Sequence, residues 1–78
     1  MAGPIDELRA ALARTPAAPP QMGPYLAKVH DRAYAVTDED VEALKSAGIS
    51  EDEIFEQTVA VAITEGLRRL DAAAEVLR

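Results

Sequence analysis

The segment from Glu51 to about Leu77 constrains this chain most, because it predicts one long helix without a proline. At 1.5 Å per residue such a helix is about 40 Å long. Its middle, TVAVAI over residues 58–63, is apolar on nearly every side. A helix that is apolar all round must be buried all round, and two or three short helices of the same chain cannot easily enclose it. The sequence therefore predicts an all-α bundle of about four helices, completed by oligomerisation.

The small size of the chain also predicts that it is stabilised by assembly. Seventy-eight residues allow one domain, and a single core of that size is marginally stable without disulfides, a metal or a partner. The chain has no Cys and one His, which excludes disulfides and argues against a structural zinc site. We expect no cofactor and no metal, so assembly remains as the stabilising device.

The charge of the chain restricts the kinds of partner that it can bind. A net charge of −6 argues against nucleic acid and against an anionic membrane surface, since both attract Lys and Arg. Asp6 and Glu7 stand where a signal peptide would be basic, and no apolar run approaches membrane-spanning length. We expect a soluble cytoplasmic protein.

The first 23 residues divide into an arm and a linker. Residues 4–14 predict a short helix with Pro4 at its first position, within an N-terminal arm over residues 1–14. The helix has a narrow apolar stripe, Ile5, Leu8 and Leu12. It could pack on its own domain or dock on a neighbouring subunit. Three prolines make residues 15–23 an extended linker, and the helical domain proper spans residues 24–78.

A second helix is predicted from Pro24 to about Ala35, and it carries His30, the only imidazole. Tyr25 and Tyr34 flank the histidine along the sequence. His30 is either an acid–base group or a boundary histidine packed between the two tyrosines.

The segment VTDEDVEALKSAGISEDEIFE predicts a tight corner between two helices. Thr37 is placed to cap a helix from Asp38 to about Ala47, with Asp40 completing a capping box. Gly48 is placed to end that helix in the left-handed conformation of a Schellman turn. Ser50 then caps the long last helix.

Two features of the last helix suggest contacts. Gly66 lies in its middle, where glycine costs about 1 kcal/mol relative to alanine, so we expect another backbone to approach there. Arg68 and Arg69, near Glu65 and Asp71, form either salt bridges or an anion site.

The segments AGISEDEIFE and VAVAITEGLRRLDAAAEVL resemble the carboxymuconolactone decarboxylase and alkylhydroperoxidase AhpD-like family. The preceding VTDEDVEALKSAG is similar to the segment before the same corner in peroxidase-related members. The resemblance covers roughly residues 25–77. It implies an all-helical fold that assembles into dimers, trimers or hexamers.

The chain departs from that family at its redox residues. Redox members carry Cys-x-x-Cys-x-x-x-His before the corner glycine and an acidic relay residue further upstream. In this register Ala33 and Val36 occupy the cysteine positions, Asp40 the histidine position and Gln21 the relay position. Peroxidase and disulfide-reductase chemistry need a thiolate, so the absence of Cys excludes both.

The sequence leaves three functional hypotheses. The first is a non-catalytic AhpD-like protein that acts through homo-oligomer assembly or partner binding, with an interface formed by Leu26, Val29, Val59, Val61, Ile63, Gly66, Leu67 and Leu70. The second is a small carboxymuconolactone-decarboxylase-like enzyme with an intersubunit pocket. Its candidate residues are His30 as acid or base, Tyr25 or Tyr34 as hydrogen-bond donor, Glu56, and Arg68 or Arg69 as a carboxylate clamp. The third is an accessory subunit that completes the site of a larger enzyme.

Overall fold

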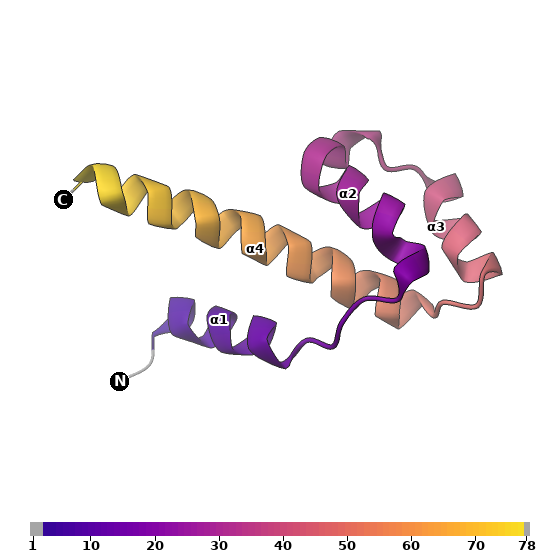
Figure 1. Cartoon of the computed structure of the whole chain (residues 1–78), viewed down its shortest axis with the longest axis horizontal. Helices are drawn as coiled ribbons and strands as arrows, with labels where there is room; N and C mark the ends of the chain where they lie inside the picture. The colour runs from indigo at the N-terminus through magenta and orange to yellow at the C-terminus, as the bar shows by residue number, and fades with distance from the viewer. Residues whose placement is uncertain (1–2, 78) are drawn as a thin grey trace.

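The computed structural model describes residues 3–77, and within that range the chain is all-helical, with no strand. Four α-helices and two short 3₁₀ turns follow one another (Figure 1). They are α1 (Pro4–Arg14), η1 (Pro20–Met22), α2 (Gly23–Arg32), η2 (Ala33–Ala35), α3 (Asp38–Ser46) and α4 (Glu51–Leu77). The prediction of an all-α chain of about four helices with a long last helix is confirmed.

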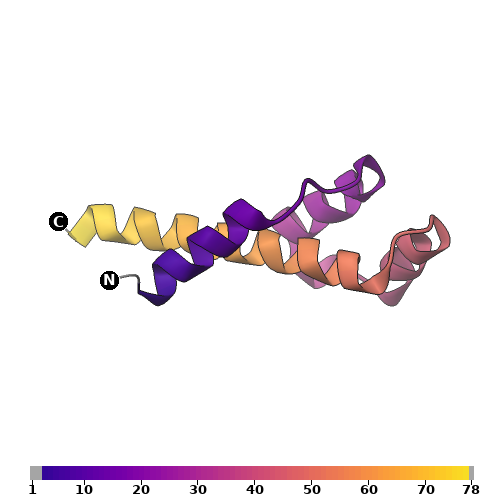
Figure 2. The same cartoon turned by 90° about the horizontal axis from the view of Figure 1, so that it is seen from below.

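Helix α4 is the axis of the molecule, and the other helices lie along it (Figures 1 and 2). Helices α2 and α3 gather at its N-terminal end. Helix α1 runs alongside it in the opposite direction, so that Arg9 Nη2 lies 2.7 Å from Asp71 Oδ1. The molecule measures 47 × 26 × 17 Å. The N-terminal arm therefore packs on its own chain in this structure.

The linker that follows α1 is held by one buried side chain. Gln57 is only 6% exposed, and its Nε2 donates a hydrogen bond of 2.8 Å to the carbonyl of Pro16. Proline cannot donate from its own nitrogen, and its carbonyl remains a strong acceptor. The hydrogen bond fixes the start of the linker against α4.

The start of α3 has the predicted capping box. Thr37 Oγ1 accepts from the backbone N–H of Asp40 at 3.3 Å, and Asp40 Oδ2 accepts from the N–H of Thr37 at 2.9 Å. These two bonds satisfy backbone donors that a helix leaves open at its first turn.

The end of α3 has the predicted Schellman turn. Gly48 has φ +92°, and its N–H donates to the carbonyl of Lys45 at 3.0 Å. The N–H of Ile49 donates to the carbonyl of Leu44 at 3.1 Å, which is the second bond of the motif. The N–H of Glu53 then donates to Ser50 Oγ at 3.1 Å. The corner between α3 and α4 is thus built as the sequence predicts.

The second predicted helix is not continuous. It was expected from Pro24 to about Ala35, and α2 instead ends at Arg32. The backbone of Arg32 has φ −149° and ψ 59°, outside the helical region, so the ladder of hydrogen bonds stops there. A 3₁₀ turn follows, closed by the bond from the N–H of Val36 to the carbonyl of Ala33 at 3.2 Å. This turn redirects the chain towards α3.

The core is small and lies where η1, α3, the corner and α4 meet. Met22 is completely buried and packs with Leu44, Ile49 and Ile54. Among the described residues, Leu67 is the one other buried apolar side chain, and it is not part of that cluster. This core holds α2 and α3 on one end of α4 and leaves the other end covered by α1 alone.

Much of α4 is therefore open. Of its 27 residues, Ile54, Gln57 and Leu67 are buried. The chain exposes 5730 Å², whereas a compact monomer of 8.3 kDa exposes about 4,600 Å². Its radius of gyration is 14.4 Å, against about 11.5 Å for a compact domain of this length. No helix within residues 3–77 combines the length and apolarity needed to cross a bilayer.

Candidate functional site

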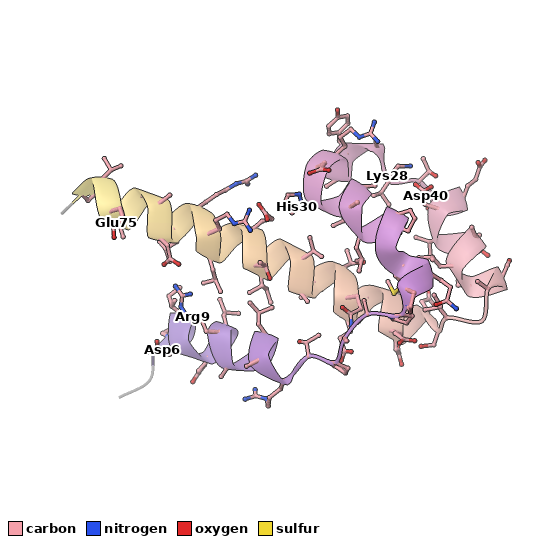
Figure 3. The ribbon with its side chains drawn as sticks, viewed as in Figure 1. Asp6, Arg9, Lys28, His30, Asp40 and Glu75 are labelled. Carbon is pink, nitrogen blue, oxygen red and sulfur yellow. The ribbon has the colours of Figure 1, made fainter. Side chains whose placement is uncertain are left out.

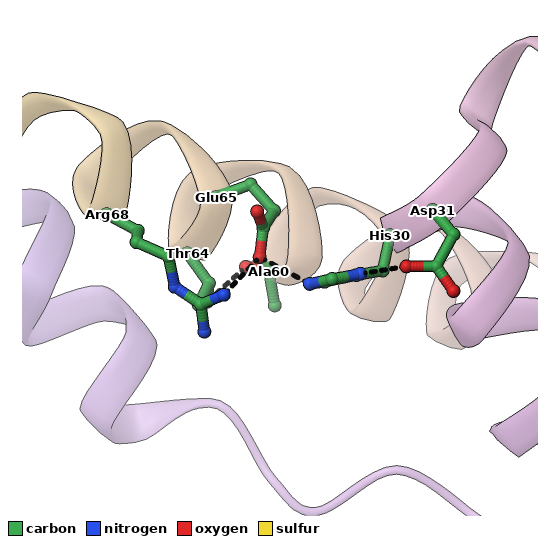
Figure 4. Close-up of polar contacts among 6 residues, drawn as sticks. All are labelled: His30, Asp31, Ala60, Thr64, Glu65 and Arg68. Atoms are coloured by element: carbon green, nitrogen blue, oxygen red, sulfur yellow. Dashed lines mark hydrogen bonds and ion pairs between the residues drawn. The ribbon is translucent and has the colours of Figure 1, made fainter.

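His30, on α2, lies between the carboxylates of Asp31 and Glu65, and the contact with Glu65 joins α2 to α4 (Figure 4). Its Nδ1 is 2.6 Å from Asp31 Oδ1, on the same helix. Its Nε2 is 2.7 Å from Glu65 Oε1, on α4. The side chain of His30 is 44% exposed. Only the imidazolium form can donate from both ring nitrogens, so both contacts favour the charged state.

The two carboxylates raise the pKa of His30 above its ordinary value of 6.5. The hydrogen bond that the His30 ring donates to Asp31 is the largest cause, and the negative charge of Glu65 adds to it. Partial desolvation and the positive charge of Arg68 act in the opposite direction without reversing the shift.

Glu65 is the most enclosed charged group of this cluster. Its side chain is 18% exposed, and its Oε1 is inaccessible to solvent without a well-aligned hydrogen bond. That oxygen instead lies within ion-pair distance of two cations, His30 at 2.7 Å and Arg68 Nη1 at 3.6 Å. Because burying an uncompensated carboxylate is costly, the ion pair with His30 is what makes this position of Glu65 tolerable.

Two hollows flank the His30–Glu65 contact. One, of about 370 Å³, is also lined by Leu26, Thr64 and Arg68. The other, of about 340 Å³, is also lined by Val29, Gly66 and Arg69, among others. The structure therefore brings His30 and the two arginines to one region of the surface.

The remaining catalytic candidates lie elsewhere. Tyr34 is 88% exposed and lines neither hollow. The Tyr25 hydroxyl is 2.8 Å from Thr58 Oγ1, and its ring packs against the core. Glu56 is exposed and lines a groove between α1 and α4. The prediction did not name Asp31 or Glu65 as partners of His30. Asp31 could have been found as its neighbour in sequence, and Glu65 only from the packing of α2 on α4.

Asp40 has a structural role. Its carboxylate caps α3 and also accepts from Lys28 Nζ on α2 at 2.9 Å (Figure 3). The hydrogen bond from Lys28, followed by the one from Thr37, lowers the pKa of Asp40 below its usual value. Across residues 3–77, no group of three or more His, Cys, Asp or Glu side chains is arranged to hold a metal ion.

The predicted interface residues fall into three groups. Leu67 is 7% exposed and is buried within its own chain, so it offers no surface to another molecule. Leu26, Val29 and Val61 are half-buried beside the hollows at His30. The others lie elsewhere on α4. Val59 and Ile63 are half-buried and line the groove between α1 and α4. Gly66 and Leu70 are exposed, and Gly66 also lines one of the hollows at His30.

One exposed aromatic side chain was missed. Phe55 is 70% exposed and lines, with Leu12, Val59 and Ile63, a groove of about 420 Å³ between α1 and α4. From the sequence, a single Phe in an acidic first turn is expected in the core. Its position around the helix in the structure shows that the side chain faces outwards.

Comparison of the chain with protein-family models, with curated proteins and with solved structures gives no match.

Proposed function

We propose that this chain is a small non-catalytic helical protein that acts through homo-oligomer assembly or by binding a partner protein. The observation that carries the proposal is the excess of exposed surface. The chain exposes about 1,100 Å² more than a compact monomer of its mass. A standard interface removes about 800 Å² from each partner, so one such contact would account for most of the excess.

The apolar side chains on that surface support the same proposal. Phe55, Leu70 and Leu77 are 70%, 45% and 85% exposed on one helix. Isolated apolar residues are normal on protein surfaces, whereas a continuous row of them marks an interaction site. An enzyme site would instead need to enclose its catalytic side chain. The side chain of His30 is 44% exposed.

The resemblance to the AhpD-like family is part of the proposal. The Schellman corner at Gly48, followed by a long Ala/Val-rich helix with Gly66 in its middle, is consistent with it. Under that resemblance the assembly is a dimer, trimer or hexamer. The acidic composition is consistent with a cytoplasmic location.

The test is the mass of the protein in solution. Sedimentation equilibrium over a range of micromolar concentrations is expected to give a mass above 8.3 kDa, or a monomer that captures one defined partner on co-purification from its source. A well-folded monomer that captures nothing would refute the proposal.

A second candidate function is a lactone-decarboxylase-like enzyme, favoured by the position of His30 between Asp31 and Glu65 beside Arg68. In that function His30 is the general acid and the arginine holds a substrate carboxylate. An NMR titration of His30 with and without a small dicarboxylate separates the two functions. A midpoint that does not move when the probe is added counts against the enzyme.

A further inference from the structure

The two halves of α2 are held to the rest of the chain in different ways. The first half carries Tyr25, which packs against the core, and Lys28, whose Nζ donates to Asp40 Oδ2 on α3 at 2.9 Å. Of the ion pairs within residues 3–77, the one that joins the second half to α4 is that between His30 Nε2 and Glu65 Oε1, at 2.7 Å (Figure 4). No residue of α2 is buried. We call the contact between His30 and Glu65 the interhelix bridge.

The interhelix bridge lies between the two hollows of about 370 and 340 Å³. His30, Val61 and Glu65 line both of them. The first hollow also has apolar side chains such as Leu26, and the second has Val29. A groove between α2 and α4 is therefore divided at the point where the two ionisable side chains meet.

The charged surroundings of His30 come from two helices. Asp31 is on α2 itself, and Glu65, Arg68 and Arg69 are on α4. Within residues 3–77, α1 and α3 contribute no charged side chain to either hollow. The protonation of His30 is thus set by two carboxylates and two guanidinium groups.

A neutral imidazole cannot keep both contacts of His30. It has one N–H and one lone pair, whereas its two ring nitrogens face carboxylate oxygens at 2.6 and 2.7 Å. One nitrogen then meets an acceptor without a proton between them, which is repulsive. Loss of the proton also removes the positive charge that compensates Glu65, whose Oε1 is inaccessible to solvent.

Glu65 has a second cation within reach. Arg68 Nη1 lies 3.6 Å from Glu65 Oε1, and Arg68 is one turn further along the same helix. Its side chain is exposed, so it has room to turn towards the carboxylate. A pair between two residues of α4 compensates Glu65 without any contribution from α2.

We propose that the interhelix bridge is a proton-dependent gate. With His30 charged, the bridge closes the second half of α2 onto α4. With His30 neutral, Glu65 pairs with Arg68, the second half of α2 separates from α4, and the two hollows become one groove that exposes Val29 and Val61. The inference goes beyond the proposed function and does not depend on whether the chain assembles.

The direction of the gate follows from the contacts of His30. Its pKa is raised above the ordinary value of 6.5, with the hydrogen bond that the ring donates to Asp31 as the largest cause. A group with a raised folded-state pKa stabilises the closed form fully below its ordinary pKa. The gate is therefore closed below pH 6.5 and opens as the pH rises through the raised pKa of His30.

The test measures how well a thiol beside the bridge is protected. The chain has no native Cys, and Val61 is half-buried and lines both hollows, so Val61→Cys reports this one position. The labelling rate in the urea-unfolded chain, divided by the rate in the folded chain at the same pH, gives the protection. We expect protection to fall about tenfold between about pH 5 and about pH 9, the ratio that corresponds to losing one hydrogen bond between charged groups.

Three controls connect this fall to the bridge. Val41→Cys replaces another half-buried valine, which packs against the core, and its protection is expected to stay within about twofold over the same range. Adding Glu65→Gln to Val61→Cys removes the charge of the bridge and is expected to abolish the pH dependence. Adding Asp31→Asn is expected to keep the fall in protection and to move it to lower pH, because the largest cause of the raised pKa of His30 is lost.

Three results would overturn the gate. The first is protection of Val61→Cys that stays within about twofold over the pH range. The second is an equal fall in the presence of Glu65→Gln, which would show that the bridge is not the cause. The third is an equal fall at Val41→Cys, which would show that the whole chain loosens. Each of them leaves the assembly proposal to its own test.

Discussion

Replacing Met22 by Ala tests whether the small cluster beside the corner is the core of the fold. Met22 is 0% exposed and packs against Leu44, Ile49 and Ile54. Truncating a buried Met to Ala costs about 2–5 kcal/mol, because the transfer free energy is lost and a cavity remains. The total stability expected for 78 residues is about 4–12 kcal/mol, so one substitution removes a large part of it.

The expected loss is large enough to measure directly. A loss of about 3 kcal/mol lowers the melting temperature by roughly 12–24 °C for a domain of this size. The assay is thermal and urea unfolding followed by circular dichroism at 222 nm, with all variants at one protein concentration, since association makes apparent stability concentration-dependent.

Two matched controls make the measurement specific. Met22→Leu nearly conserves volume and is expected to cost less than about 1.5 kcal/mol. Val76→Ala, at a side chain that is 84% exposed, is expected to stay within about 0.5 kcal/mol of the wild type. If Met22→Ala unfolds within about 0.5 kcal/mol of the wild type, the packing around η1 does not hold the fold together and the reasoning fails.

Three further predictions concern polar contacts. Thr37→Ala is expected to destabilise the chain by about 1 kcal/mol in urea unfolding, whereas Thr37→Ser keeps the cap and changes little. Gln57→Ala leaves the Pro16 carbonyl without its 2.8 Å donor, so limited proteolysis is expected to cut the linker faster; an unchanged rate would contradict the proposed anchoring. The NMR titration midpoint of His30 is expected above 6.5 and to fall in Asp31→Asn. Because the folded-state pKa is raised, its stabilising contribution is full below pH 6.5 and is lost as pH rises through the raised pKa.

Local signals made most of the fold predictable. The bounds of α1 and α4 and the corner at Gly48 follow from capping residues, prolines and glycine, which act through neighbouring backbone groups. The break after Arg32 was not predictable, because no proline or glycine marks it and the turn depends on how α2 meets α3.

The candidate site was less predictable than the fold. His30 drew attention as the only imidazole, but its contact with Glu65 joins residues 35 positions apart and depends on the packing of two helices. Phe55 is a second residue whose surroundings the local sequence does not predict. Its type suggests the core, and its angle around α4 places it outside, at 70% exposure.

The way α1 is attached has a consequence for local unfolding. None of its residues is buried, and its ion pair from Arg9 to Asp71 joins two exposed side chains. Exposed ion pairs contribute little to stability. Helix α1 is therefore bound to the rest of the chain much more weakly than the cluster around Met22. Segments with few buried contacts open at a small fraction of the global free energy. Amide protons of α1 should therefore exchange with solvent long before those of the first turns of α4, and the arm should detach while the corner stays folded.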